Sequence, residues 1–196
     1  MNKEKEIFQR DDLRTGGFYE LCIQVCPSID NKPIELYINY IWTLDNVKGP
    51  FDKDFNKTEI DINNFEHQGL ITLDNSLIPF KTFNIREEEP IEAGFNWFDI
   101  SFYTAAIEYV FGEEYKTWTE KPKCPPQIER FFDSLIKQLF KIYKFKLAII
   151  DFEVSGQYYL DDLKKPIENI FYPKFFVGTE NYDLIAEENK KSVTFI

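Results

Sequence analysis

Glycine and histidine are scarce in this sequence, and their scarcity excludes several kinds of site. Only 8 glycines occur, and neither GxxxxGKS, GxxxxGKT nor GxGxxG is present, so no glycine-rich phosphate-binding loop is predicted. The lone histidine, His67, lies in the polar segment NNFEHQG, which we interpret as an exposed turn. Metal sites and catalytic sets built on histidine need partners that one histidine in a loop does not readily find. The sequence therefore predicts no cofactor, and it favours a protein that is not an enzyme.

Cysteines and long apolar runs are also few. Cys22, Cys26 and Cys124 are odd in number and have no CxxC spacing. Cys22 and Cys26 lie four positions apart on a predicted strand, roughly 13 Å, which is too far for a disulfide. The start, MNKEKEIFQRDDLR, lacks the apolar stretch of a secretory signal, and no run approaches the roughly 18 apolar residues of a membrane span. We expect reduced thiols and a cytoplasmic location.

Basic residues are fewer than acidic ones. The 23 Lys and Arg residues face 34 Asp and Glu residues, which gives a net charge of −11. Such a surface repels nucleic acid and anionic lipid and attracts basic proteins, although acidity can serve solubility alone. We expect neither nucleic acid nor membrane as a partner. The composition leaves the oligomeric state open, and the frequent Lys, Ile, Asn and Phe are typical of an AT-rich, bacterial genome.

The size of the chain predicts one domain. At 196 residues, folding should bury roughly 70% of the unfolded surface, and 20 Phe, 11 Tyr and 3 Trp supply the core. Residues 1–16 are rich in charge, and we interpret them as a flexible tail or a short helix. Residues 17–196 form the predicted domain.

Strand patterns dominate the first half of the chain. FYELCIQVC, residues 18–26, alternates apolar and polar side chains as a half-buried strand does, and residues 34–43 are predicted to be its antiparallel hairpin partner. GLITLDNSLIPFKTFNI predicts a second hairpin that turns at residues 74–76. Residues 58–62 are a candidate edge strand, and residues 95–102 return to the strand pattern.

Helical spacing appears later in the chain. It predicts a short helix over residues 103–111 and a long amphipathic helix over about 126–145, with apolar residues at i, i+3, i+4 and i+7. A strand at 147–154, a turn of helix near 159–164 and a last strand at 192–196 follow. Strands first and helices later predict an α+β fold, with a mainly antiparallel sheet packed by the long helix.

The stretch AIIDFEVSGQ, residues 148–157, carries Asp151 and Glu153 on a predicted strand. Over these ten residues it resembles the first motif of the proofreading-type exonucleases, in which an Asp-x-Glu pair binds two metal ions. That family needs further acidic motifs and a His or Tyr base far downstream, and residues 154–196 contain no histidine. We therefore interpret the pair as the end of a strand at the rim of the sheet.

The strand FNWFDISFY places Asp99 on one face with Phe95, Trp97 and Ser101. An acid among aromatic residues is costly to bury unless it is paired, so Asp99 is either a general acid or a structural hydrogen-bond acceptor. Two alternative functions follow. One is a metal-dependent hydrolase built from Asp99, Asp151 and Glu153, and the other is a small-ligand binder whose aromatic pocket, between sheet and helix, is lined by Trp42, Trp97 or Tyr40.

Two loop regions interleave acidic and aromatic residues. Aromatic anchors ringed by carboxylates suit an interface for a basic protein, because charge steers the encounter and the rings provide burial. The leading hypothesis is thus a non-enzymatic binding module of the immunity or antitoxin type, which neutralises a basic partner such as a nuclease toxin. Its candidate contacts are Phe51, Asp52, Asp54, Phe55, Glu59, Glu113, Glu114 and Trp118.

Overall fold

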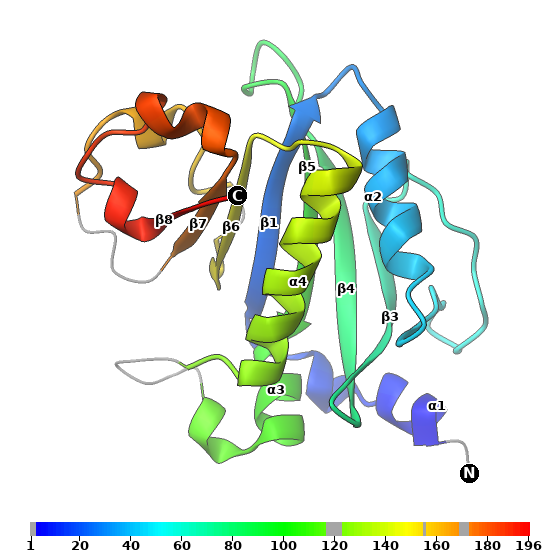
Figure 1. Cartoon of the computed structure of the whole chain (residues 1–196). Coiled ribbons are helices and arrows are strands. Elements are labelled where there is room, and N and C mark those ends of the chain that lie inside the picture. The colour runs from blue at the N-terminus through cyan, green and yellow to red at the C-terminus, as the bar shows by residue number, and fades with distance from the viewer. Residues whose placement is uncertain (1–2, 117–122, 155, 169–172) are drawn as a thin grey trace.

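An eight-stranded sheet forms the framework of the protein, in the order β2-β3-β4-β5-β1-β6-β7-β8 (Figure 1). The computed structural model describes residues 3–116, 123–154, 156–168 and 173–196. The strand pairs are antiparallel except for β7 with β8, so the expected α+β fold with a mainly antiparallel sheet is confirmed. The strands are β1 (Phe18–Pro27), β2 (Val47–Lys48), β3 (Glu66–Leu73), β4 (Ser76–Arg86), β5 (Phe95–Tyr103), β6 (Leu147–Phe152), β7 (Lys174–Val177) and β8 (Val193–Phe195).

Strand β1 lies in the interior of the sheet, between β5 and β6. Residues 19–26 are buried on both faces, so the prediction of a half-buried strand was wrong. The polar side chains of Glu20 and Gln24 are 4% and 2% exposed. The alternation of β1 therefore distinguishes two covered faces of the sheet rather than a core face and a solvent face.

Helices α2 (Lys32–Trp42) and α4 (Pro126–Ile142) cover one face of the sheet, which we call the front face (Figure 1). The prediction of a strand over residues 34–43 was wrong, because this segment is α2. Pro33 lies in the first turn, where its missing N–H costs nothing, and the apolar residues also fit helical spacing. The buried side chains of α2 are Pro33, Ile34, Tyr37, Ile38, Ile41 and Trp42.

The hairpin of β3 and β4 turns at Asp74 and Asn75, as the sequence predicts. Both residues have positive φ angles, 46° and 69°, as a tight hairpin turn with a right-handed twist requires. Pro79 pairs with Leu70 of β3, and the ladder to β5 begins only at Lys81, so the missing N–H of Pro79 breaks no bond to β5. Residues 58–62 form no strand.

The N-terminal segment packs against the body of the protein. It consists of α1 (Lys3–Phe8) and a 3-10 turn at Asp11–Arg14, and Phe8 and Leu13 are buried. Helix α3 (Thr104–Phe111) follows β5 directly, and Gly112 just after it has a φ of 115°, which favours glycine. Short 3-10 helices occur at Glu113–Tyr115, Asp162–Lys164, Thr179–Leu184 and Lys190–Ser192.

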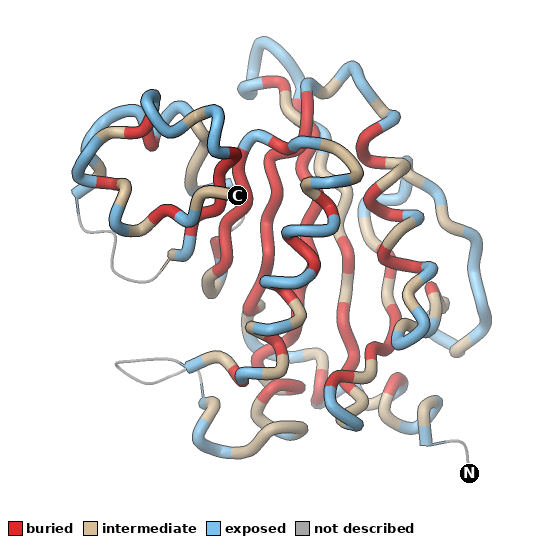
Figure 2. The backbone as a smooth tube through the Cα atoms, in the orientation of Figure 1, coloured by how far each residue is buried: buried red, intermediate tan, exposed pale blue. Residues whose placement is uncertain are grey.

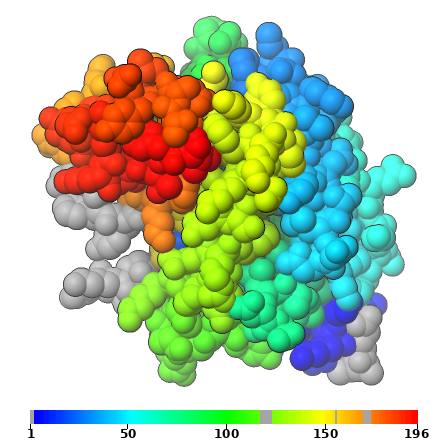
Figure 3. Space-filling view, in the orientation of Figure 1, coloured from blue at the N-terminus to red at the C-terminus, as the bar shows by residue number. Residues whose placement is uncertain are grey.

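Two hydrophobic cores lie on opposite faces of the sheet. The larger core joins α2 and α4 to front-face side chains such as Leu21 and Phe98. The smaller core joins Cys22 and Ile149, on the opposite or back face, to the C-terminal lobe, which is the described part of residues 154–196. Figure 2 shows the buried strands between these layers, and Figure 3 shows the lobe beside α4. Among the described residues, no helix has the length and apolar character that crossing a bilayer requires.

Candidate functional site: an acidic pocket on the back face

Two rows of mainly polar side chains cross the centre of the back face. Cys22, Asp99 and Phe83 are direct partners across β1, β5 and β4, and Glu20, Ser101 and Lys81 form the next row. Because side chains alternate between the faces of a sheet, all six point away from α2 and α4. The C-terminal lobe covers the part of this face next to β6, and the part over β4 and β5 adjoins a pocket.

This pocket has a volume of about 280 Å³ and combines carboxylates with aromatic rings. Asp99 and Glu20 are 1% and 4% exposed and lie deep in it, whereas Glu153 and Phe65 are exposed at its mouth. The volume is just below the usual range for small-molecule sites, so it suits the end of one side chain or a small ligand. We call it the acidic pocket, and its lining residues are Phe18, Glu20, Phe65, Phe83, Ile85, Asp99 and Glu153.

Backbone and hydroxyl donors hold the carboxylates in position. The Oε1 atom of Glu20 accepts a hydrogen bond from the Val154 N–H at 2.7 Å, and its Oε2 atom accepts one from the Ser101 hydroxyl at 3.2 Å. The Oε1 atom of Glu153 accepts a hydrogen bond from the Phe18 N–H at 2.5 Å. Glu153 has a φ of 51° and follows the end of β6, so the alternation of that strand does not extend to it. This turn of the chain brings Glu153 to the pocket.

Aromatic side chains form one wall of the acidic pocket and continue beyond it. The ring of Phe83 lies 5.4 Å from that of Phe65 and 5.7 Å from that of Phe18, and Phe18 lies 4.8 Å from Tyr103. The Lys81 ammonium group lies 5.8 Å from the centre of the Phe83 ring and 5.5 Å from that of Tyr103. These separations are within the range of cation–π attraction. The aromatic row thus already contacts one cation of the protein itself.

A second, larger pocket of about 570 Å³ lies between the C-terminal lobe and the ends of β1 and β5. Its polar groups bond to the chain: the Gln24 side chain accepts the Leu160 N–H, the Asp162 carboxylate accepts the Tyr159 N–H, and Lys164 forms an ion pair with Asp161. Such bonds fix the lobe in place. We take the acidic pocket as the candidate site because it gathers three carboxylates and three phenylalanine rings around one cavity.

A set of potential metal ligands overlaps the floor of the acidic pocket. One oxygen each from Glu20 and Asp99 and the sulfur of Cys22 lie within 4.8 Å of one another. Carboxylate and thiolate together suit zinc better than magnesium, whose ligands are oxygen atoms. Cys22, Cys26 and Cys124 form no disulfide in the part of the chain that the structure describes.

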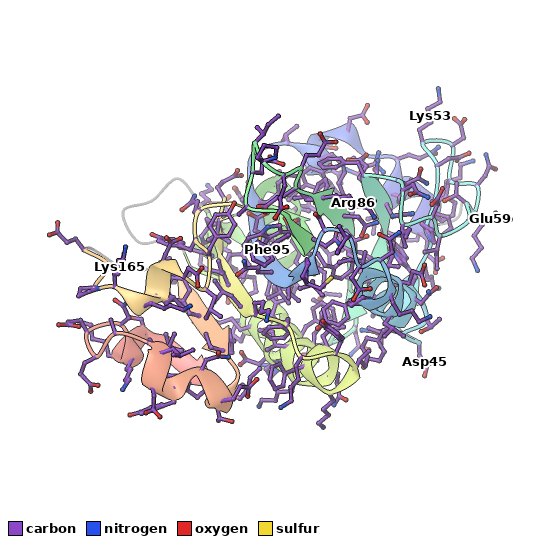
Figure 4. All side chains as sticks on the ribbon, turned by 90° about the horizontal axis from the view of Figure 1, so that it is seen from above. Asp45, Lys53, Glu59, Arg86, Phe95 and Lys165 are labelled. Carbon is purple, nitrogen blue, oxygen red and sulfur yellow. The ribbon has the colours of Figure 1, made fainter. Side chains whose placement is uncertain are left out.

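The predicted contacts in loop 51–59 serve partly as internal structure. The rings of Phe51 and Phe55 lie 5.4 and 5.3 Å from the ring of buried Phe8. Asp52 accepts hydrogen bonds from the backbone and side chain of Asn56, which lowers the pKa of its carboxyl below the ordinary value. Asp54 and Glu59 are exposed. Figure 4 shows Lys53 and Glu59 on the side of the molecule opposite Lys165.

The second predicted contact region follows α3. Glu113 and Glu114 are both exposed, and Glu113 forms an ion pair with Lys116. Trp118 lies outside the described residues. The seven predicted contacts that the structure describes all lie outside the lining of the acidic pocket.

The structure brings together only part of the predicted metal site. Asp99 and Glu153 line the acidic pocket, but Asp151 lines a different one of about 110 Å³ with Tyr19, Cys124 and others. Burial raises the pKa of the Asp151 carboxyl above its ordinary value. The metal site predicted from the sequence therefore lacks Asp151, one of its three residues. Glu20 and Cys22, which that prediction did not include, lie beside Asp99.

The residues proposed for an aromatic ligand pocket lie on both faces of the sheet. Trp42 stacks on Phe80 on the front face, at 5.1 Å between ring centres, and Tyr40 is a partly buried residue of the same helix. Trp97 lies on the back face, where its Nε1 donates to Glu87 at 2.8 Å. One pocket between sheet and helix cannot include both tryptophans.

The prediction of an exposed turn at His67 was wrong. This residue belongs to β3, is 4% exposed and lies against Trp42, with 6.2 Å between the ring centres. Its Nε2 accepts a hydrogen bond from the Asp61 N–H at 3.2 Å, and burial lowers the pKa of the ring. The polar residues around it in the sequence belong to the loop, while the histidine itself begins the buried part of the strand.

Comparison with protein-family models, with curated proteins and with solved structures finds no match to this chain. The chemistry of the described residues therefore carries the functional assignment.

Proposed function

We propose that this chain is a non-enzymatic, cytoplasmic binding module that neutralises a basic protein, in the manner of an immunity protein or antitoxin. The observation that carries the proposal is the acidic pocket, where three carboxylates and three phenylalanine rings surround one cavity. The net charge of −11 attracts a cationic partner over longer distances. The exposed carboxylates of the predicted contact loops, among them Asp54, Glu59, Glu113 and Glu114, contribute to that attraction.

The arrangement fits binding to a protein better than catalysis. The oxygens of Glu20 already accept bonds from Val154 and Ser101, so this carboxylate is fixed as part of the fold. His67, the one histidine of the chain, points to the front face and bonds to Asp61. A pocket with a buried floor of carboxylic side chains and an exposed aromatic residue at its mouth suits the insertion of an anchoring side chain of a partner.

Capture of the partner tests this proposal. The tagged protein is incubated with a lysate of its native cell, and the bound proteins are eluted in a salt series and identified by mass. We expect one stoichiometric basic protein that is released as salt rises, because screening weakens charge attraction. The association rate of the purified pair should also fall with ionic strength. Tight binding with an association rate that is indifferent to salt would refute the electrostatic proposal.

A metal-dependent hydrolase is a second candidate, and the proximity of Glu20, Cys22 and Asp99 is the observation that favours it. Their potential ligand atoms lie within 4.8 Å of one another, and one zinc ion with bonds of about 2.0–2.3 Å can bridge atoms up to about 4.6 Å apart. Zinc should then raise the melting temperature of the protein and Cys22→Ser should abolish the shift. Cys26→Ser is the matched control, since Cys26 is buried on the same strand but belongs to the front core. No zinc-dependent shift would remove this candidate.

A further inference from the structure

Resting on the proposed function, we infer that the acidic pocket receives the guanidinium group of one arginine side chain of the basic partner. Glu20 and Asp99 come from neighbouring strands, and an oxygen of each lies within 4.8 Å of the other. Two carboxylates this close repel one another when both are ionised, and a cation between them converts the repulsion into attraction. Glu153 at the mouth adds a third carboxylate along the path to the floor.

The aromatic wall favours a flat cation. The rings of Phe18 and Phe83 are inclined at 72° to each other, so they form two sides of a corner beside the carboxylates. A guanidinium group can stack on one ring while its N–H groups point to the carboxylates. Phe65 is 60% exposed at the mouth, where it can cover the aliphatic part of an inserted side chain.

Lys81 gives an independent indication of what this surface binds. Its ammonium group lies over the same aromatic row, near Phe83 and Tyr103, and forms an ion pair with Glu66 at 2.8 Å. The row thus accommodates a cation from the chain itself, next to the pocket. Lys81 is paired with Glu66, so this cation lies beside the acidic pocket and is not one of its lining residues.

The geometry also selects arginine over lysine. A guanidinium group has five N–H donors in one plane and is weakly hydrated, so it loses less on entering a buried site than a strongly hydrated ammonium group does. The floor of the acidic pocket is almost fully buried, so a cation must lose most of its hydration there, and this favours the guanidinium group. Each oxygen of Glu20 already accepts one bond and has a second lone pair, which a directional guanidinium N–H can use, whereas an ammonium group acts as a point charge.

A titration with amino-acid amides tests the inference without the partner. N-acetyl-arginine methylamide and its lysine counterpart are added to the ¹⁵N-labelled protein, and backbone amide shifts are followed by NMR. We expect saturable shifts at Phe18, Phe83 and Val154, with the lysine compound at least about 10-fold weaker. That ratio corresponds to about 1.4 kcal/mol.

Variants at the mouth keep the test clear of folding defects. Glu153→Gln removes one charge but retains an oxygen for the Phe18 N–H, and Phe65→Ala removes an exposed ring. Each should weaken the arginine compound about 3-fold to 10-fold. Asp133→Asn removes one charge from an exposed position of α4, which covers the opposite face of the sheet, and should leave the affinity unchanged. Equal affinity for the two compounds, or no effect of the two mouth variants, would overturn the inference.

The two proposals fail in different ways. Capture of a basic partner that binds Glu153→Gln and Phe65→Ala as tightly as the wild type would refute the arginine pocket and leave the binding function standing. Saturable, arginine-selective binding in the pocket without any basic protein partner would refute the binding function and leave the chemistry of the pocket standing.

Discussion

Replacing Phe8 with alanine tests whether the N-terminal segment belongs to the folded body, and hence whether the aromatics of loop 51–59 face inwards. Phe8 is 1% exposed and contacts the rings of Phe51 and Phe55. The Arg14 guanidinium lies 4.4 Å from the centre of its ring. If residues 1–16 were a mobile tail, none of these contacts would contribute to stability.

The size of the effect follows from burial. A buried Phe→Ala change costs about 3–5 kcal/mol, and this site should lie at the lower end because half-buried Phe51 and Phe55 can move into the space. We expect a loss of about 3 kcal/mol in the free energy of unfolding. For a chain of this length, that lowers the melting temperature by roughly 6–12 °C.

Urea denaturation of the wild type and two variants measures the effect. Phe65→Ala is the control, because that ring is 60% exposed and its loss should cost less than about 1 kcal/mol. A cost below about 1 kcal/mol for Phe8→Ala would show that the N-terminal segment does not pack as described. The rings of loop 51–59 would then be available to a partner, as the sequence suggested.

Three further variants test buried or half-buried polar groups. The pKa of His67 is lowered by burial, despite nearby Asp61 and Glu66, so the unfolded chain binds its proton more readily. Wild-type stability should therefore fall below about pH 6.5, by up to about 1.4 kcal/mol per pH unit, and His67→Gln should reduce this slope in urea titrations between pH 7.5 and 5.5. A slope equal in both proteins would contradict this reasoning. Burial raises the pKa of Asp151, so ionisation of this carboxyl destabilises the fold above about pH 4. Asp151→Asn should therefore raise the melting temperature at pH 7 by about a degree or more. A melting temperature below that of the wild type would show that the carboxylate stabilises the fold. Glu87→Ala removes the acceptor of Trp97, Phe95 and Tyr159 and should cost at least about 3 kcal/mol in urea denaturation. The Tyr159 pKa, which the bond to Glu87 raises to about 12, should return towards 10 in an absorbance titration, and a tyrosine spectrum that titrates as in the wild type would refute the assignment.

Local sequence patterns predicted the secondary structure correctly where they were compatible with one kind of element only. The alternation of residues 18–26 and the turn signal at Asp74 and Asn75 predicted β1 and the β3–β4 hairpin. Residues 34–43 fitted two structures, because apolar residues occur there at both spacings. Pro33 in a first helical turn was the signal that could have decided for α2.

The candidate site was only partly accessible to sequence reasoning. Asp99 was noticed because it interrupts an aromatic strand, and Glu153 because it follows Asp151 at a familiar spacing. Glu20 was taken as part of a solvent-facing row, since nothing local reveals that Val154 of the C-terminal lobe covers it. The pairing of β1 with β5, which places Cys22 opposite Asp99, is likewise a long-range property of the chain.

The position of β1 has a consequence for how the protein is made. It is synthesised well before both of its neighbours, β5 and β6, and the bond between Val154 and Glu20 spans 134 residues. Until β5 and β6 emerge, the apolar front-face side chains of β1 have no neighbouring strand, and pairing at such sequence separation is slow. Nascent chains of this protein should therefore depend on chaperones and aggregate readily when synthesis stalls before β6. This risk follows from the order of the strands along the chain and not from the stability of the finished fold.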